Sequence, residues 1–205
     1  EAEINAVAFS RDGRILMTGS IGGTIRFWDS VTWKLLARAL HYESTSFAMA
    51  FSPDGRTFAT GSRDGTARIW DAVGTMSVAA LSSRLEYSGI AVALSPAGIL
   101  VTGTEDGTVR LMDAATGKVL APLLQHEKAV VSVALSRDGR ILAAKTEDGA
   151  VHLWDAVTGK ALAPPLQHVS YVLARAFSPD SRTLATGSMS GAVRFWDGFG
   201  RPLVP

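Results

Sequence analysis

Four histidines and three Asp-Gly pairs that stand in one recurring turn are residues whose types could support metal binding or acid–base catalysis. A neutral imidazole can hold a metal ion or act as a general base near neutral pH. The histidines are His41, His126, His152 and His168, and the Asp-Gly pairs stand at 64–65, 106–107 and 148–149. The histidines form no cluster at ligand spacing, and no pair belongs to the Asp-x-Asp-x-Asp-Gly pattern of a calcium loop. The sequence therefore predicts no metal site and no cofactor.

Other kinds of chemistry are excluded by composition. The chain has no cysteine, which excludes a thiol nucleophile, a thiolate metal site and a disulfide framework. The segment GSIGGT resembles a phosphate-binding loop but lacks its lysine. Twenty basic and nineteen acidic side chains give a net charge of +1 without any run of like charge. We therefore expect neither nucleic acid nor a membrane surface as a partner.

The histidines and Asp-Gly pairs belong instead to an internal repeat. The tripeptides FWD, IWD, LMD, LWD and FWD end at Asp29, Asp71, Asp113, Asp155 and Asp197, at intervals of 42 residues. A second signal, SRDGR or SPDGR, keeps the same register at 10–14, 52–56 and 136–140. A fixed period of this length indicates a repeat architecture, in which neighbouring units stack to bury a continuous core.

Each repeat is predicted to form a four-stranded antiparallel sheet. The segments between turns are short and rich in Val, Ile, Leu, Phe and Thr, and Asp-Gly pairs favour tight hairpins. In the fourth repeat the strands are expected at 130–135, 141–146, 150–154 and 160–166. Pro164 and Pro165 lie in the last of these, which suits an outer edge strand because proline has no N–H to donate. The fold class is therefore all-β.

The period, the turn signals and the GSxDGTxRxWD pattern resemble the WD40 (WD-repeat) family of β-propellers. The resemblance covers residues 1–205 and implies five blades of four antiparallel strands, at about 1–41, 42–83, 84–125, 126–167 and 168–205. Members of this family favour about seven blades. We therefore expect an open arc of a larger propeller, with a closed five-bladed ring as the alternative. The bare terminal blades of an arc would favour self-association.

The resemblance also implies a hydrogen-bond chain of His, Ser or Thr, Asp and Trp that braces each blade. The residues at these positions in blade two are His41, Thr60, Asp64 and Trp70. The later blades carry partial sets, namely Asp106 in blade three, His126, Asp148 and Trp154 in blade four, and His168, Thr186 and Trp196 in blade five. We expect these residues to be structural.

The third repeat departs most from this pattern. Met112 replaces the Trp, and Arg84 falls near the His position. A buried Trp needs a partner for its indole N–H, whereas Met adapts to the available space. We expect Met112 to be a core residue, and Met112→Trp alone to gain little stability because no His is available.

The resemblance implies a non-enzymatic scaffold that binds a protein or peptide on its rim, where the loops before each innermost strand and the Asp-Gly turns emerge. The candidate contact residues are Phe47, Arg63, Ile90, Glu105, Val131, Glu147, Tyr171, Leu173 and Met189. With equal weight, the apolar members could instead pack on one another along the channel. A structural spacer in a long array is the alternative function. A propeller hydrolase is disfavoured because the channel positions are mostly apolar.

The sequence also suggests a larger context. It begins EAEINAVAFS, without an initiator Met or a leader, which is typical of a segment of a longer chain. The sequence patterns LAPPLQH and SPDGRTxATGS resemble those of repeat arrays in large multidomain bacterial proteins. The compartment is left open, with a slight preference for the cytoplasm.

Overall fold

The computed structural model describes residues 3–36, 39–41, 46–52, 55–62, 66–71, 83–84 and 89–203, of which 46–47, 71, 83–84 and 89–90 are described by their backbone alone. These segments form strands, turns and loops. Among them is no helix of the length and apolar character needed to cross a lipid bilayer.

The strands form five antiparallel sheets, one for each repeat. The first three sheets have four strands each: β1 (Ile4–Phe9), β2 (Ile15–Ser20), β3 (Thr24–Asp29) and β4 (Leu40–His41); β5 (Ser46–Phe51), β6 (Thr57–Ser62), β7 (Thr66–Asp71) and β8 (Ser83–Arg84); β9 (Gly89–Leu94), β10 (Ile99–Thr104), β11 (Thr108–Asp113) and β12 (Leu124–Gln125). The other two have three strands each: β13 (Val130–Leu135), β14 (Ile141–Thr146) and β15 (Val151–Asp155); β16 (Val172–Phe177), β17 (Thr183–Ser188) and β18 (Val193–Asp197).

The prediction of a fourth strand in every repeat is wrong for repeats four and five. The segment expected at 160–166 makes only two isolated bridges, from Ala161 to Trp154 and from Leu166 to Val151. Pro164 and Pro165 lie between these bridges and have no N–H to continue the ladder. In repeat five the chain likewise makes only the bridge between Pro202 and Trp196 among the described residues. The strands predicted at 130–135 and 141–146 are confirmed.

The hairpin between the first two strands of each repeat has a recurring local cause. In repeat four the Ser136 hydroxyl donates to the Asp138 carboxylate at 2.6 Å and accepts from the backbone N–H of Ile141 at 2.9 Å. Gly139 then turns the chain at a φ of +74°, a conformation that costs glycine little. Ser181 takes this position in repeat five at a φ of 63°. Its hydroxyl accepts from the N–H of Asp138 at 3.0 Å, which ties the two repeats together.

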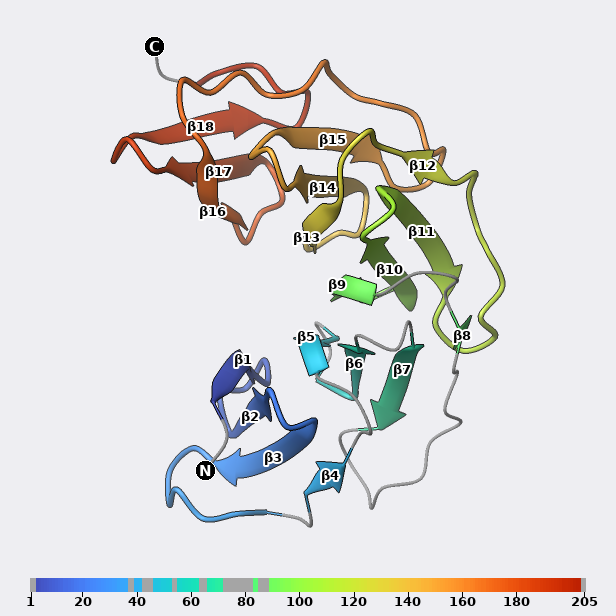
Figure 1. The fold of residues 1–205 in the computed structure, drawn as a ribbon, viewed down its shortest axis with the longest axis vertical. Coiled ribbons are helices and arrows are strands. Elements are labelled where there is room, and N and C mark those ends of the chain that lie inside the picture. The colour runs from blue at the N-terminus through green and yellow to red at the C-terminus, as the bar shows by residue number, and fades with distance from the viewer. Residues whose placement is uncertain are drawn as a thin grey trace.

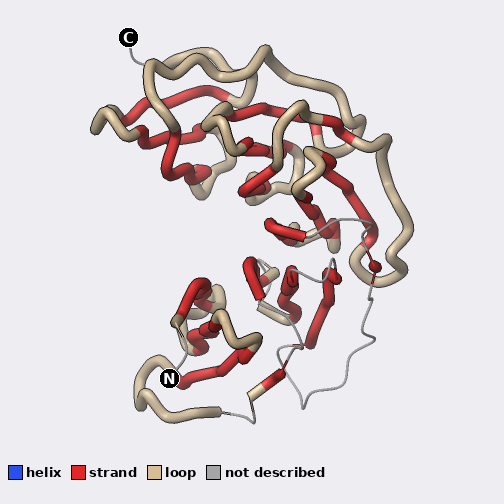
Figure 2. Tube along the Cα trace, in the orientation of Figure 1, coloured by secondary structure: helices blue, strands red, loops and turns tan. Residues whose placement is uncertain are grey.

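The sheets follow one another along an open arc. Figure 1 shows β1, β5, β9, β13 and β16 on the inner side of the arc, with the first and last sheets at its two ends. The same course is visible in the trace of Figure 2, where the two end sheets remain apart. The first and last sheets share no strand among the described residues. The five sheets are therefore arranged like the blades of a propeller whose ring is not closed.

The core lies between neighbouring sheets. Each sheet has a leading face, turned toward the preceding repeat, and a trailing face, turned toward the following one. Val101, Val109 and Leu111 on the trailing face of the third sheet pack against Val133 and Leu142 on the leading face of the fourth. Corresponding apolar clusters join the first sheet to the second, the second to the third and the fourth to the fifth. Each sheet thus depends on its neighbours for burial.

Within the described part of the chain, each of the two end sheets keeps one apolar face without a neighbouring sheet. On the trailing face of the last sheet Val193 is 62% exposed, whereas its equivalents Val109 and Val151 are fully buried. Phe195 beside it is 41% exposed, although Leu111 at the same position is fully buried. Val7 and Phe9 are exposed in the same way on the leading face of the first sheet. These residues are core positions that lack a partner sheet.

Candidate functional site

The fifth blade contains a continuous hydrogen-bond chain from its outer strand to the loop before its inner strand. The Trp196 indole N–H donates to Thr186 Oγ1 at 2.9 Å, and Thr186 Oγ1 lies 2.8 Å from His168 Nε2. His168 Nδ1 lies 3.0 Å from the carbonyl of Leu166. Because a carbonyl can only accept, Nδ1 carries a hydrogen, and the neutral ring accepts at Nε2. The chain fixes the loop that precedes Tyr171.

In the fourth blade histidine and tryptophan meet directly. Ala144 stands where the other repeats have threonine, and the Trp154 indole donates straight to His126 Nε2 at 3.2 Å. His126 Nδ1 lies 3.0 Å from the carbonyl of Gly107. Since the indole nitrogen is only a donor, His126 must be neutral with its hydrogen on Nδ1. Burial lowers the pKa of His126, and the bond to Gly107 opposes this effect.

The first two blades brace tryptophan through threonine without histidine among the described contacts of those tryptophans. Trp28 donates to Thr18, and Trp70 donates to Thr60, each at 3.0 Å. His41 instead lies 3.3 Å from Thr24 Oγ1, at the strand position that Gln125 occupies in blade three. The predicted Asp64 lies outside the described residues. In both blades a Thr–Trp bond connects the second and third strands.

The turn aspartates bond within their own hairpins. Asp148 accepts from the Thr146 hydroxyl at 2.6 Å and from the N–H of Ala150 at 3.2 Å. The bond from Thr146 is the main cause that lowers the pKa of the Asp148 carboxyl. Burial would raise the pKa of Asp106, but its bonds from Thr104 and Thr108 outweigh burial and lower it. These aspartates hold the turns of the rim in shape.

The third blade has a gap in its bracing. Met112 is 2% exposed and packs in the cluster that contains Ile69, Leu94 and Leu100. Thr102, which corresponds to the threonines that accept from tryptophan elsewhere, has a buried hydroxyl without a hydrogen-bond partner in the described part of the chain. A buried polar group without a partner destabilises a fold by about 1–3 kcal/mol. The missing donor is the indole that Met112 replaces.

This gap changes the expectation for Met112→Trp. The substitution should raise the free energy of unfolding by about 1 kcal/mol, because the new indole can donate to Thr102 as Trp28 does to Thr18. Chemical unfolding monitored by fluorescence measures the change. Met112→Phe is the matched control, since it adds a ring without a donor. Equal stability of the two variants would show that the hydroxyl needs no partner.

Acid should weaken the fourth blade through His126. Its pKa is lowered in the folded chain, so the unfolded chain binds the proton more tightly, and stability must fall as the pH drops below about 6.5. His126→Gln keeps an acceptor for Trp154 but does not titrate, so its free energy of unfolding should decrease less between pH 7 and pH 5.5. Exposed His41→Gln is the matched control and should retain the wild-type decrease. The same decrease in His126→Gln would contradict this role.

The rim residues that the structure describes are most apolar at blade five. Leu173 and Met189 are exposed, and the N–H of Met189 donates to the carbonyl of Tyr171 at 2.9 Å. The half-buried Tyr171 ring covers Gly149 so closely that a Cβ on the glycine would lie 2.7 Å from the ring. The structure thus brings Tyr171 and Met189 together beside the turn of blade four.

The other rim candidates are more scattered. Glu105 and Glu147 are exposed on the turns of blades three and four, and Val131 is half-buried. The backbone positions of Phe47 and Ile90 lie in β5 and β9, whereas Arg63 falls outside the described residues. No group of three or more potential metal ligands is found in the described part of the chain.

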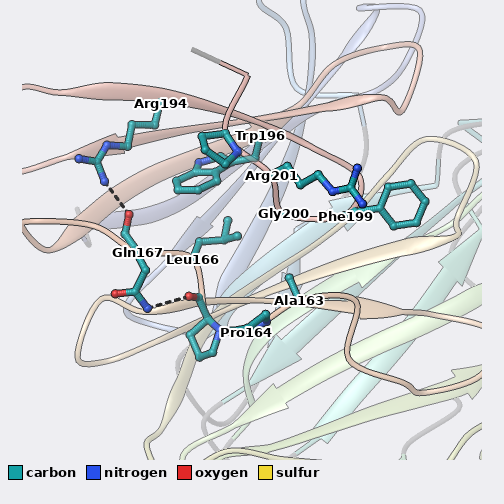
Figure 3. A pocket seen from close by; sticks show the side chains of 11 residues that line it. Ala163, Pro164, Leu166, Gln167, Arg194, Trp196, Phe199, Gly200 and Arg201 are labelled. Atoms are coloured by element: carbon teal, nitrogen blue, oxygen red, sulfur yellow. Dashed lines mark hydrogen bonds between the residues drawn. The ribbon is translucent and has the colours of Figure 1, made fainter. Parts of the chain in front are cut away.

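A cavity that the sequence did not indicate lies at the outer side of blades four and five (Figure 3). Its volume is about 590 Å³, and Pro164, Trp196 and Phe199 are among its lining residues. Arg194 donates to the carbonyl of Gln167 at 2.5 Å, and the Arg201 guanidinium lies 5.9 Å from the centre of the Phe199 ring. The proline pair that interrupts the outer strand, Pro164 and Pro165, forms part of its lining.

Comparisons with known proteins agree with this geometry. The family model "WD domain, G-beta repeat" matches residues 1–29, 39–71, 83–113, 117–155 and 164–197. Among solved structures, the crystal structure of the computationally designed Ika8 protein aligns with 99% of this chain at a TM-score of 0.77 and 29% sequence identity. The chain spans 61% of the length of that designed protein. The comparison with curated proteins found no match. Since 1760 chains of solved structures are similar, the fold alone does not select a partner.

Proposed function

Because the chain belongs to the WD40 repeat family, we propose that it is a non-enzymatic scaffold that binds a protein or peptide partner on its rim. WD40 repeats generally mediate protein–protein interaction. The observation that carries the proposal is the exposed apolar pair Leu173 and Met189 beside Tyr171. Exposed apolar and aromatic side chains at the centre of a surface are the usual anchors of protein interfaces.

Two other functions have less support. A hydrolase needs carboxylates that converge on one point, whereas the described rim carboxylates Glu105 and Glu147 stand on different blades and are exposed. A spacer would not need exposed apolar residues on the rim, because neighbouring repeats would cover only the leading and trailing faces. The apolar rim of blade five therefore favours binding over spacing.

We further propose that the five sheets are part of a larger propeller in a multidomain protein of bacterial type. The bare trailing face of Val193 and Phe195 and the bare leading face of Val7 and Phe9 are built to receive further blades. The similar designed chain is longer by the length of about three such repeats. Where no further blade covers them, the same faces can pack against a second copy of the chain, which would produce head-to-tail association.

The rim proposal is tested by capture of partners on immobilised chain. Leu173→Asp combined with Met189→Asp should reduce the captured protein at least tenfold, because charges replace two exposed apolar side chains that a bound partner would bury. The melting temperature should change by only a few degrees, since both side chains are exposed. Val157→Asp, an exposed apolar residue away from the rim candidates, is the matched control. Equal capture by the rim double variant and the control would overturn the proposal.

A further inference from the structure

Two cationic residues occupy positions that are glycine or apolar in every other repeat. Lys145 in β14 replaces the glycine that β2, β6, β10 and β17 carry as Gly19, Gly61, Gly103 and Gly187. Arg175 in β16 pairs with Thr186, and the residues at the same register elsewhere are Val7, Met49, Val92 and Val133. Lys145 lies on the trailing face of the fourth sheet and Arg175 on the leading face of the fifth. The two departures therefore meet at one boundary.

The glycine position is where neighbouring sheets approach most closely. A Cβ on Gly103 would lie 2.6 Å from Val130 and 3.2 Å from Val133 of the next sheet. Lys145 introduces a long side chain at the same point of the next boundary. The innermost strands β13 and β16 are accordingly packed less closely than β9 and β13. The boundary between blades four and five is thus wider, and at these two positions it carries charge where the other boundaries carry glycine and Val or Met.

Neither cation has a counter-ion among the residues that the structure describes. Lys145 is 7% exposed, and its Nζ lies 4.5 Å from the centre of the Tyr171 ring. Arg175 is half-buried, and its buried Nε has no hydrogen-bond partner. Within the described part of the chain, no carboxylate contacts either side chain.

The electrostatic consequences agree with this geometry. Burial and the charge of Arg175 lower the pKa of Lys145, and burial lowers the pKa of Arg175 to about 10. Arg175 therefore keeps its charge at neutral pH. Two neighbouring cations removed from water destabilise a fold unless an anion compensates them.

We propose that the boundary between blades four and five is a binding site for an oxyanion, a phosphate or a carboxylate group held between Lys145 and Arg175. A guanidinium offers a planar pair of N–H donors, and an ammonium adds a compact charge. The guanidinium matches the planar geometry of such anions, and the ammonium adds a positive charge beside it. Tyr171 lies over Lys145 and beside Met189, so the site adjoins the rim. The proposal does not depend on the rim being a protein-binding surface.

Binding of inorganic phosphate tests the site. Calorimetric titration gives its Kd, and thermal unfolding is followed at pH 7 with sodium phosphate replacing sodium chloride at constant ionic strength. At ten times its Kd, phosphate should raise the melting temperature of the wild-type chain by about 3–5 °C. A parallel series with acetate distinguishes a carboxylate from a phosphate. Phosphate also stabilises proteins by exclusion from their surface. The decisive quantity is therefore the difference between the wild type and each variant in the rise of melting temperature that phosphate causes.

The repeats supply the test variants. Arg175→Val introduces the residue of three other blades, and Lys145→Met removes the charge while keeping most of the length. Each should weaken phosphate binding at least tenfold and remove the rise in melting temperature. Exposed Lys128→Met is the matched control, and Leu173→Asp shows whether the site is independent of the rim.

Three results would overturn the proposal. The first is that neither phosphate nor acetate binds to the wild-type chain. The second is that phosphate raises the melting temperature of Arg175→Val as much as that of the wild type. The third is that Lys128→Met loses as much phosphate affinity as Arg175→Val or Lys145→Met. If one of the two variants fails to fold, the other decides. If Leu173→Asp loses partner capture but still binds phosphate, the anion site is independent of the rim proposal.

Discussion

Contact between neighbouring sheets is the interaction on which the rest of the structure depends. No sheet of this chain can bury both of its faces by itself, and the buried clusters all lie at the boundaries between repeats. Between the third and fourth sheets the close approach requires a glycine in the second strand, since a Cβ at Gly103 would overlap Val130. Where Lys145 replaces this glycine, the innermost strands of the next two sheets pack less closely. The same rule explains why the two end sheets expose residues that are buried elsewhere.

The tryptophan bonds are a second level of order within each sheet. In blades one, two and five they connect the third strand to a threonine of the second. In blade four the tryptophan instead bonds to His126, in the loop before the first strand. The histidine of blade four must be neutral to serve in this way, which makes that blade sensitive to acid. Blade three lacks the donor and leaves the Thr102 hydroxyl without a partner. The blades are therefore equivalent in topology but unequal in internal bonding.

Much of the fold could be predicted from the period of 42 residues, because turns and tryptophans in register define the strands between them. The outer strands could not be predicted as reliably, since two prolines remove the donors that a ladder needs. The structural position of Met112 was predicted, but the unpartnered Thr102 hydroxyl was not, because burial of a single atom depends on its neighbours in space. The pairing of Lys145 with Arg175 was missed for the same reason. They stand 30 positions apart in the sequence and meet only when two sheets pack.

If packing between sheets is the source of stability, the protection of backbone amides against hydrogen exchange must depend on how many neighbouring sheets a sheet has. Amide hydrogen exchange on dilute chain tests this claim most directly. Strands β10 and β14 lie in sheets with a neighbour on both faces, and their amides should exchange more slowly than those of β2 and β17 in the two end sheets. Equal protection in all four strands, or slower exchange in the end sheets, would contradict the account.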